Sequence, residues 1–227
     1  MRAWQAWAPH ATSKLGLSVC VLSSGRGVSV GGQFFGSPRG LQSLIRPLMS
    51  TGHPSSGPGI TQRSFFDAVL LYAGCDSVAA CHRVQREAFK AKSDYVRRPL
   101  SKAAVRTIVR GLDHFSAGSL SVILDSYGGA INKVPAGATA FAHRDMLYSI
   151  QYYATPGSHA NIAALNGFYH AMRPYVSGQA YVNYVDPQQP NWLHAYYGKN
   201  LKRLVSIKRK HDPSNFFHFK QSIPRRL

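Results

Sequence analysis

Apolar and polar positions follow two different periods along this chain, and the two periods separate strands from helices. Runs that are β-branched and apolar, or that alternate every second residue, predict strands. These runs cover residues 17–24, 27–36, 120–124, 138–142, 147–153, 180–184 and 216–223. The strands do not alternate regularly with helices, which argues against a parallel doubly wound sheet.

Apolar residues spaced three and four positions apart predict helices with one apolar face. A serine at the N-cap precedes the second, third and fourth of these segments. The predicted helices cover residues 41–49, 65–73, 102–115, 158–172 and 200–210, and Pro47 is expected to disturb the last turn of the first. A polar Gly/Pro/Ser loop is expected over residues 52–59. The pattern favours an α+β fold in which an antiparallel sheet is covered by helices on one face.

Composition allows a buried core, and the charge balance is strongly basic. Of 227 residues, 44% are hydrophobic, and 27 Lys and Arg face only 9 Asp and Glu, a net charge of +18. Such a charge raises the question of nucleic-acid binding. The basic residues are spread out, however, and their densest run, residues 199–210, reads as an amphipathic helix with a basic outer face. Without a nucleic-acid-binding motif, we expect no nucleic-acid partner, and the charge favours an anionic substrate or a negatively charged second domain.

The chain contains no apolar run of about 18 residues or more, the length that a membrane helix needs. Residues 1–10 contain no apolar signal core followed by a cleavage site. We therefore expect a soluble chain with no membrane partner and, by default, a cytoplasmic location.

Several classes of active site lack their sequence signatures. The histidines have no HExxH spacing, so no metal site is expected. The three cysteines contain no CxxC pair, which predicts idle thiols rather than disulfides or zinc ligands. GxGxxG and the Walker loop are absent, and Glu87 is the only glutamate, so paired-glutamate chemistry is excluded.

Tyrosines crowd the second half of the chain and are the remaining candidates for chemistry. A phenol can exchange a proton, or hold a flat ligand with its ring and hydroxyl. Core packing is the more common role of such a cluster. The residues by themselves therefore predict an α+β domain with an aromatic-lined cleft and leave both roles open. The cluster comprises Tyr148, Tyr152, Tyr153, Tyr181, Tyr184, Tyr196 and Tyr197.

The last third of the chain carries a more specific pattern. Residues 180–224 contain, in order, a Y-x-N-Y-x-D element, a YYG-N element, an RLV-IK-K helix, a DP-N-F turn and a final QSI. This order resembles the C-terminal signature of the berberine bridge enzyme-like FAD-linked oxidases. Further segments are similar to the family's substrate domain, so that the resemblance spans nearly the whole chain. They are residues 4–9, 89–96, 125–135 and 141–154.

The resemblance implies a two-part architecture and FAD as cofactor. Residues 1–178 would form a substrate-binding domain, and residues 179–227 would close an FAD-binding domain whose N-terminal half precedes residue 1. The partners would be a small-molecule substrate and that missing half. Cys20, Cys75 and Cys81 lie outside the region where the family attaches its flavin, so no covalent link is assigned to them.

The resemblance also implies roles for individual residues. Tyr184 would be the catalytic base that deprotonates the substrate, and Asn183 and Tyr181 would lie with it beside the flavin. Some members carry the base carboxylate where this chain has Gln151. Some alcohol-oxidising members carry a lysine where it has Ser149. Both positions are expected to contact substrate, together with Tyr153.

Two functions remain open from the sequence. The first is an FAD-dependent oxidoreductase that oxidises an alcohol, a sugar or an amine by hydride transfer to the flavin. The second is a truncated, catalytically inert fragment of such an enzyme that binds no flavin alone.

Overall fold

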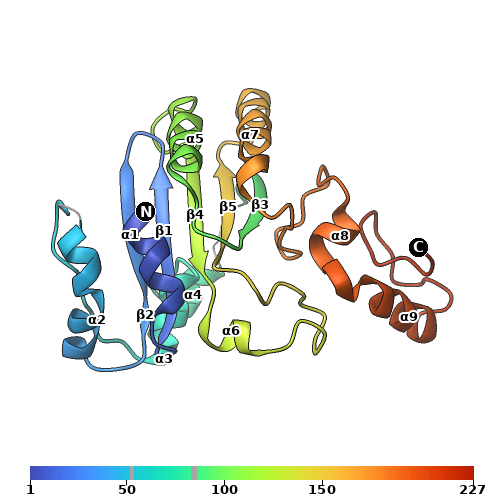
Figure 1. The fold of residues 1–227 in the computed structure, drawn as a ribbon, viewed down its shortest axis with the longest axis horizontal. Helices are drawn as coiled ribbons and strands as arrows, with labels where there is room; N and C mark the ends of the chain where they lie inside the picture. The colour runs from blue at the N-terminus through green and yellow to red at the C-terminus, as the bar shows by residue number, and fades with distance from the viewer. Residues whose placement is uncertain (52–53, 83–85) are drawn as a thin grey trace.

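The strands form one antiparallel sheet in the order β2-β1-β4-β5-β3 (Figure 1). The structure is a computed structural model that describes residues 1–51, 54–82 and 86–227. All neighbouring strands are antiparallel, as the sequence predicts. The strands are β1 (Leu15–Ser23), β2 (Gly27–Phe34), β3 (Lys90–Val96), β4 (Leu120–Ser126) and β5 (Tyr148–Ala154).

Helices cover one face of this sheet, which confirms the predicted α+β class. The covering helices are α1 (Arg2–Trp7), α5 (Lys102–Asp113) and α7 (His159–Met172). Their starts agree with the N-cap prediction, because the hydroxyls of Ser101 and Ser158 accept hydrogen bonds from backbone N–H groups three residues later. The other helical segments are η1 (Ala8–His10), α2 (Pro38–Thr51), α3 (Phe65–Tyr72), α4 (Val78–Cys81), α6 (Gly129–Lys133), η2 (Arg173–Tyr175), α8 (Trp192–Tyr197), η3 (Gly198–Asn200) and α9 (Leu201–His211).

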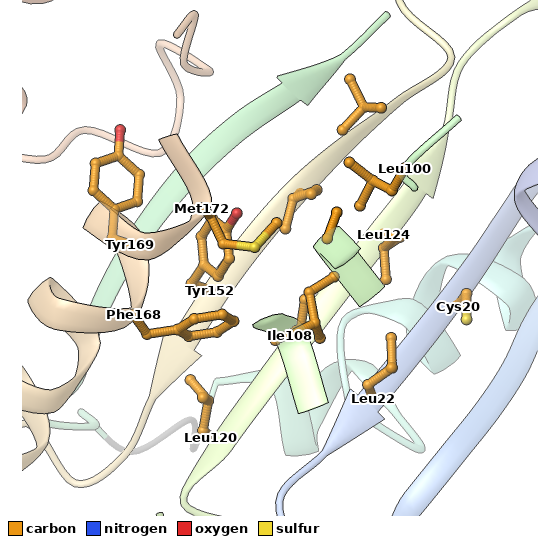
Figure 2. Close-up of a cluster of buried hydrophobic side chains, with 14 of the residues drawn as sticks. Cys20, Leu22, Leu100, Ile108, Leu120, Leu124, Tyr152, Phe168, Tyr169 and Met172 are labelled. Carbon is orange, nitrogen blue, oxygen red and sulfur yellow. The ribbon is translucent and has the colours of Figure 1, made fainter. Parts of the chain in front are cut away.

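The core lies between the sheet and these helices (Figure 2). Every second residue of β4 and β5 is buried there, because successive side chains of a strand point to opposite faces. Trp4 anchors α1 to the same face, since its indole N–H donates to the Ser18 hydroxyl at 2.9 Å. The core side chains include Leu22, Ile108, Leu120, Leu124, Ile150, Tyr152, Phe168 and Met172.

Three predicted strands are wrong. Residues 138–142, 180–184 and 216–223 contain no strand. The first segment is held as a loop, because the Asn200 side chain donates to the Thr139 carbonyl at 3.0 Å. The third is folded into a turn, because the Asp212 carboxylate accepts from the Phe216 N–H at 2.7 Å. In both segments, side-chain hydrogen bonds to the backbone replace a strand ladder.

The expected effect of Pro47 is also wrong, because α2 continues through it to Thr51. The hydroxyls of Ser50 and Thr51 both donate to the Pro47 carbonyl at 3.1 Å, which supports the last turn. Of the predicted loop over residues 52–59, positions 52 and 53 lie outside the described residues.

The prediction of three idle thiols fails for two of them. Cys75 and Cys81 form a disulfide that joins the segment after α3 to the last residue of α4. The short α4 brings their Cα atoms to 5.3 Å, within the range that a disulfide spans. Cys20 is free and buried in the core.

The segment that follows α7 leaves the sheet at the β3 edge and carries α8 and α9 beyond it (Figure 1). As predicted, α9 is amphipathic, with Leu201 and Val205 buried and four basic residues in its last turn. In the described part of the chain, no helix is long and apolar enough to cross a bilayer.

Candidate active site

The face of the sheet opposite the core, which we call the open face, is lined by polar and aromatic side chains. It is exposed at β2 but covered around Ser93, Tyr95 and Ser149, which are buried. In the register of β4 and β5, Ser149 pairs with Asp125, and Gln151 pairs with Ile123. Residues 149, 151 and 153 alternate with the buried Ile150 and Tyr152 along β5, so their side chains point to the opposite face. The three positions expected to contact substrate, Ser149, Gln151 and Tyr153, therefore lie along one row of this face. Gln151 and Tyr153 are partly exposed, whereas Ser149 is buried.

The Y-x-N-Y element lies at the β3 edge as a turn. Its first residue, Tyr181, donates its backbone N–H to the hydroxyl of Ser93 in β3 at 2.9 Å. The turn is closed by the Tyr184 N–H, which donates to the Tyr181 carbonyl at 3.0 Å. The rings of Tyr181 and Tyr184 meet edge to face, with centroids 5.0 Å apart. The element thus attaches to β3 through a side-chain acceptor instead of adding a strand.

The three residues expected beside a flavin lie together in this turn. Asn183 is exposed, and its amide donates to the Tyr181 hydroxyl at 3.0 Å. Tyr181 and Tyr184 are half-buried, so part of each ring faces solvent. An exposed amide beside two accessible rings suits one wall of a site for a planar ligand.

The carboxyl of Asp125 lies close enough to Tyr184 to change its proton affinity. Burial, followed by the charges of Asp125, Tyr181 and Tyr127, raises the pKa of Tyr184 to about 12. Burial also raises the pKa of Asp125, against an opposing effect of the Ser149 hydroxyl. The charge of Asp125, on the open face, therefore acts on the Tyr184 phenol of the turn, and among the described residues no hydrogen bond joins the two side chains.

Asp125 is a candidate site residue that the motif did not indicate. It is the penultimate residue of β4 and lies two positions after Ile123, so the alternation of the strand was enough to assign it to the open face. The scarcity of acidic residues, nine in the chain, was a second available signal.

An aromatic cluster supports the floor of the site. Tyr95 lies on the same face of the sheet but is fully buried, and its ring stacks on His143 with centroids 4.3 Å apart. Its hydroxyl shares a 3.2 Å hydrogen bond with the Tyr127 hydroxyl. Burial raises the pKa of both phenols and lowers the pKa of His143, so all three are neutral near pH 7. Tyr127 also borders a cavity of ≈ 190 Å³ formed with residues 8–18 and 126–131.

Tyr153, at the end of the row formed with Ser149 and Gln151, already uses its hydroxyl in a hydrogen bond within the protein. It donates to the Glu87 carboxylate, which also accepts from the Thr155 hydroxyl at 2.8 Å. The Tyr153 ring stacks on Phe89, with centroids 4.9 Å apart. Burial and the Glu87 carboxylate raise the pKa of Tyr153 to about 12. A substrate at this end of the row would meet a negatively charged rim.

Among the described residues, no three His, Cys, Asp or Glu side chains converge in a way that could hold a metal ion. The residues that could contact a cofactor are those of the 181–184 turn and the adjoining open face.

Known proteins resemble this chain over its full length. The family described as berberine and berberine-like matches residues 180–224. The FAD-linked oxidoreductase YgaK of Bacillus subtilis is 31% identical over 97% of this chain and 48% of its own length. Berberine bridge enzyme-like 17 of Arabidopsis thaliana is 38% identical over 60% of this chain and 29% of its own length.

Solved structures agree with these sequence relatives. BBE-like 1 of Physcomitrella patens has a TM-score of 0.88 at 31% identity, covering 100% of this chain and 50% of that one. Phl p 4, a grass pollen allergen with glucose dehydrogenase activity, has a TM-score of 0.81 at 26% identity, covering 98% and 51%. The chain spans about half the length of YgaK and of both solved proteins. It therefore belongs to the berberine bridge enzyme-like family of FAD-linked oxidoreductases.

Proposed function

We propose that this chain supplies the substrate-binding face and the catalytic base of an FAD-dependent oxidoreductase that oxidises an alcohol, a sugar or an amine. The observation that carries the proposal is the half-buried Tyr184, packed edge to face on Tyr181 in the turn at the β3 edge, where the charge of Asp125 acts on its phenol. In this assignment, residues 1–178 bind substrate and residues 179–227 complete the flavin-binding part.

The 181–184 turn fits one wall of a flavin site. Its exposed Asn183 amide can hydrogen bond to a polar ring edge, and the rings of Tyr181 and Tyr184 offer an apolar surface. The net charge of +18 also suits a cofactor that carries a diphosphate. When bound, FAD supplies the acceptor for the hydride that leaves the substrate carbon.

The chain's own residues manage the proton that must leave the substrate. With its pKa raised to about 12, Tyr184 is a neutral phenol at neutral pH, so it needs somewhere to send its proton before it can act as a base. We assign Asp125 as the acceptor of that proton, because its charge is the one that acts most strongly on Tyr184. Its raised pKa makes it a stronger base than an exposed carboxylate. Tyr184 then takes the substrate proton as its own proton passes to Asp125.

The row along β5 orients the substrate. The Gln151 amide is partly exposed and offers both a donor and an acceptor, while Ser149 adds a hydroxyl beside Asp125. Glu87, held by Tyr153 and Thr155, accepts hydrogen bonds at the far end. Acceptors at both ends of the row suit a substrate with several hydroxyl groups, which favours a sugar within the proposed class.

The test is substitution of Tyr184 in flavin-loaded protein. Tyr184→Phe keeps the ring and removes the proton-accepting oxygen, so we expect loss of flavin absorbance after addition of glucose, a primary alcohol or an amine to slow about 100-fold. Asp125→Asn should slow the same step, because Tyr184 then lacks its proton acceptor. Tyr72→Phe, on the exposed α3, is the matched control and should leave the rate unchanged.

Unchanged rates in Tyr184→Phe would remove this residue from the catalytic role. The half-length match favours a second candidate, an inert fragment that binds no flavin alone. Titrating FAD into the 227-residue chain, and into the chain joined to the unmatched part of YgaK, separates the two. Binding only in the joined protein would identify the chain as an incomplete enzyme.

A further inference from the structure

Asp186, two residues after Tyr184, is a buried carboxylate held by two lysines. Its side chain is 2% exposed. It accepts from Lys90, and from Lys92 at 2.7 Å, both on β3. Burial by itself would raise the pKa of Asp186, but hydrogen bonds from both lysines and from the Gln188 N–H outweigh it and lower the pKa. The group is therefore a carboxylate at neutral pH.

The backbone of Asp186 joins two further elements. Its N–H donates to the Tyr196 hydroxyl of α8 at 3.0 Å. Its carbonyl accepts from the Gln221 side chain at 2.9 Å. Residues from β3, α8 and the C-terminal tail thus converge on one residue. Of the polar groups of Asp186, both carboxylate oxygens, the N–H and the carbonyl are all satisfied.

The catalytic turn is consequently fixed at both ends by the same strand. At its start, Ser93 holds the Tyr181 N–H from the open face of β3. After its end, Lys90 and Lys92 hold Asp186 from the face of β3 that packs on α7. Since neighbouring residues of a strand point to opposite faces, the segment wraps around the β3 edge. Tyr184 lies between the two anchors.

We propose that Asp186 is a positioning residue that, through its contacts with Lys90 and Lys92, holds Tyr184 against the open face beside Asp125. The inference rests on the proposed function of Tyr184. It predicts that the environment of the Tyr184 phenol depends on a carboxylate on the other side of the strand. A buried ion pair is a poor source of net stability, which suits a role in fixing geometry.

The test reads the Tyr184 phenol directly. 3-Fluorotyrosine, whose phenol is more acidic than that of tyrosine, is placed at position 184 of the full chain, and its fluorine NMR signal is followed against pH. In Asp186→Asn, Lys90 and Lys92 lose their counter-ion and the turn is released. The titration midpoint should then fall by about one pH unit or more, half of the rise from 10 to about 12 that burial, Asp125 and neighbouring phenols cause.

Asp94→Asn is the matched control. Like Asp186, Asp94 is a buried aspartate in an ion pair. It lies on β3, and its partner is Arg173, which follows α7 and is not part of the catalytic turn. This control should lose stability and keep the Tyr184 midpoint, which separates positioning from a general loss of packing. Far-ultraviolet circular dichroism at each pH establishes that the titrated protein is folded.

A folded Asp186→Asn with an unchanged midpoint would overturn the proposal. If that variant does not fold, Ser93→Ala decides. Loss of the other anchor should lower the midpoint in the same direction, and an unchanged midpoint there would overturn the proposal equally. The measurement needs neither flavin nor turnover, so a chain that oxidises nothing contradicts the proposed function and leaves this result standing.

Discussion

The two faces of the sheet are built from the same strands and differ in almost every physical property. On the covered face, Leu120, Val122 and Leu124 of β4 are fully buried against α5 and α7. On the open face, Ser121, Ile123 and Asp125 of the same strand are only partly buried. Alternation along a single strand therefore assigns stability to one face and chemistry to the other. Substitutions at two adjacent positions of one strand can therefore affect different properties, folding at one position and function at the next.

The largest expected effect comes from testing this alternation on adjacent residues of β4. Leu124→Ala removes a fully buried side chain and should lower the free energy of unfolding by about 3 kcal/mol. Ile123→Ala, one residue earlier on the open face, should cost about 1 kcal/mol. Urea denaturation followed by circular dichroism measures both. Equal losses would contradict the division of the two faces.

The second expected effect is on the pH dependence of stability, and it concerns two carboxyl groups, Asp94 on the covered face of the sheet and Asp125 on the open face. Burial raises the pKa of Asp94 to about 7 despite its contact with Arg173, and it also raises the pKa of Asp125. A carboxyl that binds its proton more tightly when folded stabilises the protein most at low pH. That contribution disappears as pH rises from about 4 towards 7. We therefore expect the free energy of unfolding to fall across this window because of Asp94.

Variants isolate each carboxyl from other titrations. The pKa of His143 is lowered by burial, so its contribution to stability rises with pH and opposes that of the carboxyls. Subtracting the pH profile of Asp94→Asn from that of the wild type removes the contribution of His143. We expect Asp94→Asn to flatten the pH dependence more than Asp125→Asn does, because Asp94 is the more deeply buried. An unaltered profile in Asp94→Asn would contradict the raised pKa.

The smallest effect compares helices that cover the sheet with one that does not. Ser101→Ala and Ser158→Ala each remove an N-cap hydrogen bond from a covering helix and should cost about 1 kcal/mol. Ser64 caps α3 in the same way, but α3 buries none of its residues. Ser64→Ala should therefore leave the midpoint of global unfolding unchanged in thermal denaturation. A loss equal to the other two would show that α3 belongs to the cooperative core.

Local patterns predicted most of the central elements because each depends on neighbours in sequence. The apolar runs of β1 and β4, the alternation of β2 and β5, and the serine caps of α3, α5 and α7 are all confirmed. β3 was not predicted as a strand from its pattern, because it is buried on both faces and contains Lys92 and Asp94. Those charges become compatible with a strand only when Asp186 and Arg173 neutralise them.

The candidate site divides in the same way. The motif assigned Tyr184, Asn183 and Tyr181 to one element, and the period of β5 grouped Ser149, Gln151 and Tyr153, so both sets were available from the sequence. Their catalytic, cofactor-binding and substrate-binding roles stay predictions until Tyr184 and its neighbours are substituted.

The sequence by itself determined the periods of its strands and helices, the caps that start the helices, and the family to which the chain belongs. Only the tertiary structure decided that the Y-x-N-Y element is a turn, that Asp125 lies beside Tyr184, and that Asp186 meets a lysine 96 residues away. Periodicity indicates which way a side chain points within its own element. It does not indicate which distant residue will neutralise a buried charge, and we propose that at the β3 edge this pairing, between Asp186 and the two lysines, determines where the Tyr184 phenol lies.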